Sequence, residues 1–148
     1  MNLLDRLAFG WGARLPMSLQ TEAAECGLAC LAMIAAYYGY PSELTELRRR
    51  LAVSLKGVNL KNLISMGDRV GFASRPVRLE LEELRMLKTP CILHWDLNHF
   101  VVLKRAIRDG VVIHDPAAGV RRLCHFGTIA SCFAGRAASA CQLSLRPR

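Results

Sequence analysis

The sequence predicts an α+β fold in which N-terminal helices pack on a C-terminal antiparallel β-sheet. The first half of the chain has helical apolar spacing and helix caps, whereas short β-rich runs separated by turn residues follow Pro90. Consecutive helices followed by consecutive strands are typical of this class. Because no repeat or linker composition is present, residues 1–148 are expected to form a single domain.

The length and composition are those of a folded globular domain. With 148 residues, 52% of them hydrophobic and 22% charged, the chain can bury a substantial core and is not expected to be disordered. The net charge of +8 would suit an acidic partner such as nucleic acid, anionic lipid or an acidic peptide. The one run of like charge, Arg48-Arg49-Arg50, has no interleaved aromatic residues and matches no nucleic-acid-binding motif, so no nucleic-acid partner is expected.

No segment predicts a membrane span or a signal peptide. The longest apolar stretch, residues 26–40, is shorter than the roughly 20 residues that cross a bilayer. Asp5 and Arg6, followed by a short apolar patch at 7–13, make a poor signal peptide, so a cytoplasmic domain is expected. The cysteines contain no Cys-x-x-Cys pair and are expected to be reduced thiols, mostly packed as small apolar side chains. They are Cys26, Cys30, Cys91, Cys124, Cys132 and Cys141.

Four helices are expected before the strands. In the first, apolar residues surround the whole circumference, which is typical of a central buried helix, and Gly39 follows as its stop. Ser42 is the expected N-cap of the second helix, and Asn59 and Gly71 are the expected cap and stop of the third. The helices are expected at residues 26–38, 42–51, 59–70 and 80–87.

Five strands are expected after Pro90. Each is a short run rich in β-branched or apolar residues, and Arg108-Asp109-Gly110 is a hairpin turn signal between two of them. The strands are expected at residues 91–95, 100–105, 111–114, 120–124 and 140–145.

Cys26 is the candidate nucleophile because it stands at the expected start of the buried helix. Free backbone N–H groups and the helix dipole favour a thiolate there. Glu22 and Glu25 act in the opposite direction, so a positive partner such as an imidazolium is required. Without that partner Cys26 would be an ordinary buried cysteine, as Cys30 one turn later is expected to be.

His99 is the histidine best placed to be that partner. It follows the loop 96–98 and directly precedes the apolar run 100–103, so a strand fixes its backbone while its ring can point out of the sheet edge. A structural histidine in the core or at a turn is the alternative for His99, and it is the interpretation adopted for His94, His114 and His125.

Asp115 ends the next strand and is the candidate that orients His99. A tight turn on Asp109-Gly110 would set Asp115 opposite Lys104, about five residues from His99, so the strand register alone does not join them. A wider turn centred near Ile107 would join them. Because Asp-Pro pairs also start turns, a purely structural role for this aspartate stays open.

Gln20 is the candidate oxyanion donor. Six residues before Cys26, its side-chain amide could lie beside the thiolate and the backbone N–H of Cys26. Zinc ligation by Cys26, Cys30 and His99 is a competing interpretation, but the spacing matches no usual metal site. The missing Cys-x-x-Cys pair likewise disfavours a regulatory thiol or metal-binding domain, so neither a metal nor a cofactor is expected.

Several blocks of sequence carry a resemblance to a known family. The two main blocks are residues 20–34 and 89–103, and His114-Asp115-Pro116-Ala117 and Leu47-Arg48-Arg49-Arg50 also fit. On these blocks the chain resembles the C39 bacteriocin-processing peptidases, above all the N-terminal domain of colicin V-type peptidase-containing ABC transporters. The resemblance covers essentially all of 1–148 and implies one C39 peptidase domain, excised from a transporter with transmembrane and ATP-binding domains.

The resemblance implies a papain-like cysteine protease fold with Cys26 as nucleophile, His99 as base, Asp115 as its orienting partner and Gln20 in the oxyanion hole. The implied substrate is a bacteriocin or microcin-like precursor, whose leader is removed after a double-glycine-type pair during export. This would occur at the cytoplasmic face of the bacterial inner membrane, although the isolated domain would be soluble. A non-catalytic leader-docking module is the alternative, but such relatives lack the cysteine.

The same resemblance implies an apolar groove for an amphipathic leader helix. The sequence does not locate this groove. Exposed apolar positions of the helix expected at 59–70 are candidates, with core packing as the more common use of such residues.

Overall fold

The computed structural model describes residues 14–52, 57–95, 99–133 and 138–146 and has the predicted α+β architecture. Among these residues, the helices are η2 (Ala23–Glu25), α2 (Cys26–Tyr37), α3 (Leu44–Leu51), α4 (Leu60–Arg69), η3 (Leu81–Met86) and α5 (Phe126–Cys132). The strands are β1 (Phe72–Leu79), β2 (Cys91–Trp95), β3 (His99–Ile107), β4 (Gly110–Asp115), β5 (Gly119–Cys124) and β6 (Ala138–Leu145). They form an antiparallel sheet in the order β1-β6-β2-β3-β4-β5.

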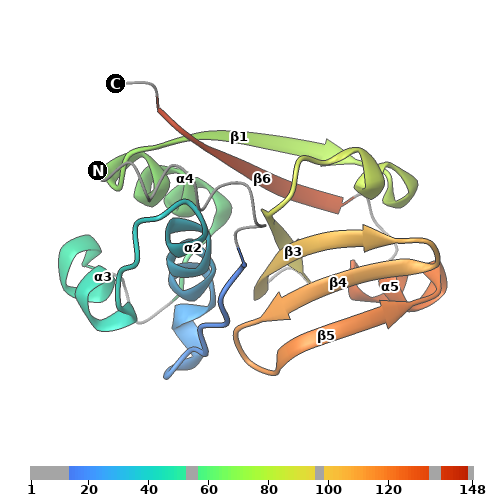
Figure 1. The fold of residues 1–148 in the computed structure, drawn as a ribbon, viewed down its shortest axis with the longest axis horizontal. Helices are drawn as coiled ribbons and strands as arrows, with labels where there is room; N and C mark the ends of the chain where they lie inside the picture. Colours follow the sequence, from blue (N-terminus) through green and yellow to red (C-terminus); the bar gives the residue numbers. More distant parts are fainter. Residues whose placement is uncertain (1–13, 53–56, 96–98, 134–137, 147–148) are drawn as a thin grey trace.

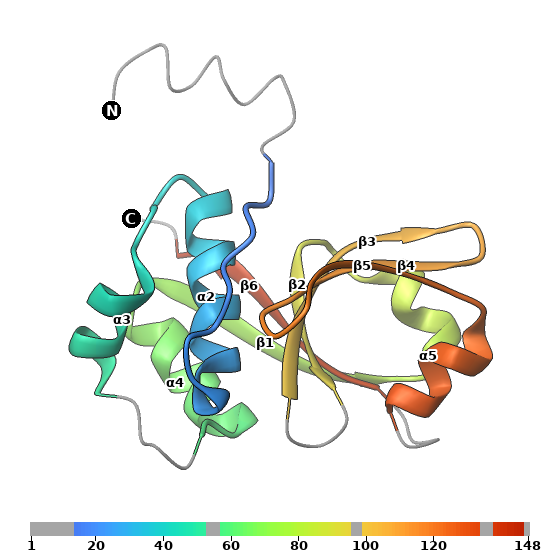
Figure 2. The ribbon, with the colours of Figure 1, turned by 90° about the horizontal axis from the view of Figure 1, so that it is seen from below.

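The sheet joins two regions, each with its own hydrophobic core. Helices α2, α3 and α4 gather at one end of the molecule, β3 to β5 and α5 lie at the other, and the long strands β1 and β6 run between them (Figures 1 and 2). On β3, Phe100 and Val102 belong to the core around α2, whereas Val101 and Leu103 belong to the core beneath α5 and η3. This division follows from the alternation of side chains along a strand.

Helix α2 is the buried centre of the helical region, as the sequence predicts. Every residue from Cys26 to Ala35 is buried, and Gly39, with φ at 87°, takes the left-handed conformation that ends the helix. The Asn59 side chain caps α4 by accepting a hydrogen bond from the backbone of Asn62 at 2.8 Å, which confirms the expected cap. No helix in the described ranges has the length and apolar character needed to span a bilayer.

Two elements differ from the expected helices. Helix α3 begins at Leu44 with Glu43 at the N-cap, so the expectation that Ser42 caps it is wrong. Burial of Leu47 and Leu51 against the core sets the position of this short helix and overrides the capping preference of serine. The short fourth helix is present as the 3-10 helix η3.

The sequence analysis missed β1 and α5. Pro76 in the middle of β1 argues against a strand because proline has no N–H to donate. However, β1 lies at the edge of the sheet, where this missing N–H costs no hydrogen bond between strands. The five expected strands are all present, with ends shifted by at most two residues. The apolar patch 7–13 and the loop 96–98 lie outside the described residues.

The hairpin between β3 and β4 has a tight turn, one residue earlier than the sequence analysis placed it. Ile107 pairs with Gly110, so Arg108 and Asp109 form the turn, and the wider turn centred near Ile107 is absent. A Cβ atom on Gly110 would lie 1.8 Å from the backbone oxygen of Leu123 on β5, so only glycine fits at this point.

Candidate active site

Cys26 is the first residue of α2, which confirms the expected helix start, and it is 4% exposed. The His99 side chain and the backbone of Phe100 and Gly27 lie close enough to its thiol to lower the pKa of Cys26. Helix α2 therefore presents the sulfur to the start of β3, where His99 is the first residue.

His99 and Asp115 meet through the register of the β3–β4 hairpin. A β-bulge between Leu103 and Arg105 adds one residue to β3, and Val102 then pairs with His114. One further step sets Asp115 opposite Val101, so His99 is its diagonal neighbour, a separation that side chains can bridge. The His99 Nε2 atom lies 2.7 Å from Asp115 Oδ1, and Nδ1 is therefore the ring nitrogen left for Cys26.

Asp115 is held by more than His99. Its Oδ1 also accepts a hydrogen bond from the Ala117 backbone N–H at 2.9 Å, and Arg121 Nη1 lies 3.5 Å from Oδ2. Burial acts to raise the pKa of Asp115, but these hydrogen bonds and the charge of His99 lower it overall. The carboxylate is thus charged and fixed. Its hydrogen bond from Ala117 also forms a turn, so Asp115 has the structural role that the sequence analysis left open as well.

The environments of Cys26 and His99 favour a thiolate and an imidazolium. Burial acts to raise the pKa of Cys26, but the hydrogen bond and charge of His99, with the Phe100 and Gly27 backbone, lower it overall. The hydrogen bond to Cys26 is the largest effect on His99, and together with Asp115 it outweighs burial and raises the pKa of His99 to about 9. The two groups titrate as a coupled pair.

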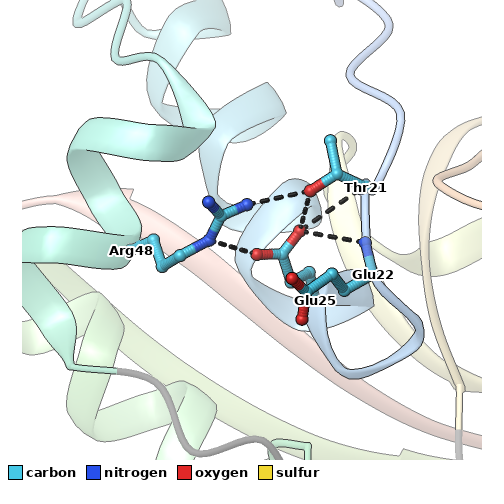
Figure 3. Close-up of polar contacts among 4 residues, drawn as sticks. All are labelled: Thr21, Glu22, Glu25 and Arg48. Carbon is cyan, nitrogen blue, oxygen red and sulfur yellow. Dashed lines mark hydrogen bonds and ion pairs between the residues drawn. The ribbon is translucent and has the colours of Figure 1, made fainter.

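Glu25, next to Cys26, has a counter-charge that the sequence analysis did not foresee. Its buried carboxylate forms an ion pair with Arg48 of α3 and accepts hydrogen bonds from Thr21 and Glu22 (Figure 3). The hydrogen bond from Arg48 is the main reason that the pKa of Glu25 is lowered to about 2, despite its burial. The expected opposition of Glu25 to a thiolate is therefore offset within the fold.

Gln20 lies against the loop that follows Asp115. Its backbone N–H donates to the carbonyl oxygen of Pro116 at 2.9 Å, which ties the segment before Cys26 to the end of β4. Its side-chain Oε1 is buried and accepts no hydrogen bond from the described residues. A buried polar group without a protein partner is a candidate for a functional contact.

The remaining histidines have structural positions. His94 stacks on Phe100 with ring centroids 4.7 Å apart, and His125 precedes α5. His114 is buried and its Nδ1 lies 3.0 Å from the Pro16 carbonyl oxygen, but its Nε2 has no partner among the described residues, so it is only half satisfied. Burial lowers the pKa of His114, consistent with a neutral ring.

Where their side chains are described, the cysteines form no disulfide bond. Cys26, Cys30, Cys91, Cys124 and Cys141 are free, and the Cys132 side chain lies outside the description. Burial raises the pKa of Cys30 far above its ordinary value, as expected of an inert core thiol. Within the described ranges, no group of three His, Cys, Asp or Glu residues is placed to hold a metal ion.

Sequence reasoning missed two arginines of this site. Arg121 is two residues beyond Gly119, which pairs with Asp115, so an alternating register across the β4–β5 hairpin could have revealed it. Arg48 entered the sequence analysis only as part of the basic run at 48–50, and nothing local in the sequence links it to Glu25. Leu60 and Ile64, two apolar residues of α4, are partly buried and pack against the core.

Comparison with known proteins finds a matching family model and several similar proteins. The model of the peptidase C39 family matches residues 14–138. The colicin V secretion/processing ATP-binding protein CvaB of Escherichia coli is 50% identical over 121 residues, covering 82% of this chain and 17% of the relative. The probable microcin-H47 secretion/processing ATP-binding protein MchF of Escherichia coli is 47% identical over 122 residues, covering 82% and 18%. The chain thus spans less than a fifth of the length of these relatives.

Solved structures agree on the fold. A double glycine motif protease from an AMS/PCAT transporter, solved in complex with the leader peptide, has a TM-score of 0.77 and 33% identity, covering 90% of this chain and 94% of that one. The peptidase domain of Streptococcus ComA has a TM-score of 0.76 at 21% identity, with 90% and 100% covered, and supports the fold alone. The expected papain-like α+β fold is confirmed, and the chain belongs to the peptidase C39 family of cysteine peptidases.

Proposed function

We propose that this domain is a cysteine endopeptidase that removes a double-glycine-type leader from a bacteriocin or microcin-like precursor. The observation that carries the proposal is the connected chain of Cys26, His99 and Asp115, with the thiol at a helix start and the imidazole between thiol and carboxylate. Among proteins similar to this one, several are named for secretion and processing, and one is a double glycine motif protease bound to a leader peptide.

In the first half of the proposed reaction, the Cys26 thiolate attacks the carbonyl carbon of the second glycine of the pair. The C–N bond breaks, the His99 imidazolium gives its proton to the leaving amine, and the leader stays attached to sulfur as a thioester. Asp115 holds the ring in the orientation that points Nδ1 at the sulfur. The pKa shifts of the two groups, down for Cys26 and up for His99, favour the charged forms that this step requires.

In the second half, neutral His99 takes a proton from water, and the resulting hydroxide attacks the thioester. The leader leaves with a carboxylate, and the thiolate and imidazolium are regenerated. We assign Gln20 and the backbone N–H of Cys26 to the negative oxygen that forms in both halves. Such donors act where charge develops in the transition state and so lower the barrier.

Selection of a glycine pair fits a site in which the nucleophile is only 4% exposed. Residues without side chains let the substrate backbone approach a buried sulfur, whereas bulky residues would hold the carbonyl away. We propose that leader binding supplies the remaining specificity. We also propose that the domain works beside transmembrane and ATP-binding domains of one transporter, at the cytoplasmic face of the bacterial inner membrane.

The test is incubation of the domain with the precursor peptide encoded beside its gene, followed by mass spectrometry of the products. Wild type is expected to cut once, after the glycine pair, whereas Cys26→Ala is expected to bind the leader without cutting it. Cys30→Ala is the matched control, because it removes a thiol from the next turn of the same helix, and it is expected to retain most activity. Leader binding without cleavage by wild type would favour a docking module instead.

A further inference from the structure

A buried carboxylate stands immediately before the nucleophile. The Glu25 side chain is 5% exposed, although carboxylates are seldom buried without strong partners. Its Oε2 accepts hydrogen bonds from Thr21 Oγ1 at 2.7 Å and from the backbone N–H groups of Thr21 and Glu22, each at 3.2 Å. Its Oε1 accepts from Arg48 Nε, and Arg48 Nη2 also donates to Thr21 Oγ1 at 2.8 Å (Figure 3).

These contacts link three parts of the site. Thr21 and Glu22 directly follow Gln20, Glu25 directly precedes Cys26, and Arg48 belongs to a different helix, α3. One carboxylate therefore folds the segment between the two functional residues into a closed turn, and one guanidinium fastens that turn to the helical region. Arg48 is the only charged donor to Glu25 among the described contacts.

The charge of Glu25 by itself would hinder the proposed chemistry. A negative group next to a thiolate disfavours the thiolate, and burial strengthens the effect because water cannot screen it. A positive partner in direct contact cancels most of this field. The guanidinium is suited to the task because it stays charged and its fork can reach both Glu25 and Thr21.

We propose that Arg48 is a positioning residue for Cys26, which acts through Glu25 by neutralising its buried charge and fixing the turn from Gln20 to Cys26. This role rests on the proposed function, since it explains how the nucleophile keeps its thiolate beside a carboxylate. It also assigns different roles to neighbouring arginines: Arg49 is exposed and pairs with Glu46 on its own helix, so it has no link to the nucleophile.

Other charged and titratable groups lie near this arrangement and must be separated from it. Glu22 acts on Arg48 from the segment before η2, His99 acts on Cys26 from β3, and Asp115 and Cys30 interact within the same site. None of these groups is changed by substitutions at positions 25 and 48. A double substitution at these two positions can therefore isolate the effect of the Glu25 charge.

The experiment measures the rate of Cys26 alkylation by iodoacetamide as a function of pH, with the modified residue identified by peptide mapping. Arg48→Met is expected to move the acid limb of this profile up by about one pH unit, and so to slow alkylation about tenfold below the limb. Glu25→Gln is expected to have its limb at or below the wild-type pH. The double variant R48M/E25Q is expected to return to wild type, because the uncompensated charge is gone.

The pH of the limb separates the proposal from a purely structural role. If the ion pair only stabilised the fold, Arg48→Met would lower the stability but leave the limb of the folded protein at the wild-type pH. An unshifted limb in folded Arg48→Met, or a double variant whose limb stays above that of wild type, overturns the proposal. If Arg48→Met does not fold, the comparison of the double variant with wild type decides, and Arg49→Met is the matched control expected to match wild type.

Alkylation requires no peptide substrate, so the two proposals can fail separately. A wild-type domain that alkylates as expected but cuts no precursor would refute the proposed function and leave the role of Arg48 in thiolate formation intact. Cleavage by wild type with no effect of Arg48→Met on the alkylation profile would refute the inference alone.

Discussion

Replacement of Asp115 by asparagine tests the proposed triad most directly. Asp115 Oδ1 lies 2.7 Å from His99 Nε2, and an asparagine oxygen could still accept that bond, but without charge. A hydrogen bond between two charged groups contributes about 1.5–3 kcal/mol, which corresponds to about one to two pKa units. Since the pKa of His99 is raised to about 9 in the native site, it is expected to fall to about 7–8 in Asp115→Asn.

The direction of the resulting pH effect follows from the charge state. The imidazolium gives the proton to the leaving amine, so activity is present below the pKa of His99 and lost as pH rises through it. The basic limb of kcat/KM is therefore expected to move down by about one to two units. At about pH 8.5 this lowers kcat/KM about 3- to 25-fold, with a smaller change near pH 6.

The assay is kcat/KM for precursor cleavage between about pH 5 and 10. Asp115→Ala is expected to be worse at every pH, because both His99 and the backbone N–H of Ala117 lose their acceptor. Asp109→Asn, an exposed aspartate in the turn of the same hairpin, is the matched control and should match wild type. A basic limb of Asp115→Asn that stays near the wild-type position would refute the reasoning. Wild-type activity in Asp115→Ala would mean that Asp115 only forms the turn and has no part in catalysis.

Three further outcomes are expected. Gln20→Ala should lower turnover about 10²–10³-fold with little loss of leader affinity, because an oxyanion donor acts mainly in the transition state. Lost affinity with a normal single-turnover rate would instead make Gln20 a docking residue. Iodoacetamide should modify Cys26 before Cys30 or Cys91, whose pKa values burial raises, and peptide mapping that finds either modified first would contradict a lowered pKa at Cys26. A leader with a scrambled apolar face should be cut slowly despite an intact glycine pair, since remote contacts hold the scissile bond in register; efficient cleavage would show that only the glycines are read.

The predictions from the sequence were most accurate where a single residue type at a single position determines the local backbone structure. The all-apolar circumference after Cys26 requires a buried helix, and its first residue is then placed beside free N–H groups. Asn59 and Gly39 act within one turn of their helix ends, so their effect is local and was predicted correctly. The same holds for the position of His99 at the start of a strand.

The sequence predicted least well where long-range packing decided. The contact between His99 and Asp115 depends on a bulge near Lys104 and on the exact turn residues. The alternation of apolar and polar residues along the strands reveals neither feature. The ion pair of Glu25 with Arg48 joins residues 23 positions apart, which no helical or strand period connects. The resemblance to a family supplied the first contact, but it gave no role to the second.

Gly110 has no space for a side chain. The proposed catalytic contact between His99 and Asp115 therefore depends on a residue at the turn end of the β3–β4 hairpin. A side chain there would meet the Leu123 backbone, so β4 could accept it only by moving away from β5 or by pairing with its neighbours one residue out of step. A one-residue slip turns every side chain of a strand to the opposite face. Asp115 would then point away from His99 although no residue at the site had changed. Inactive variants of this domain can therefore arise at its hairpin turn, with the nucleophile, the base and the carboxylate all still present in the sequence.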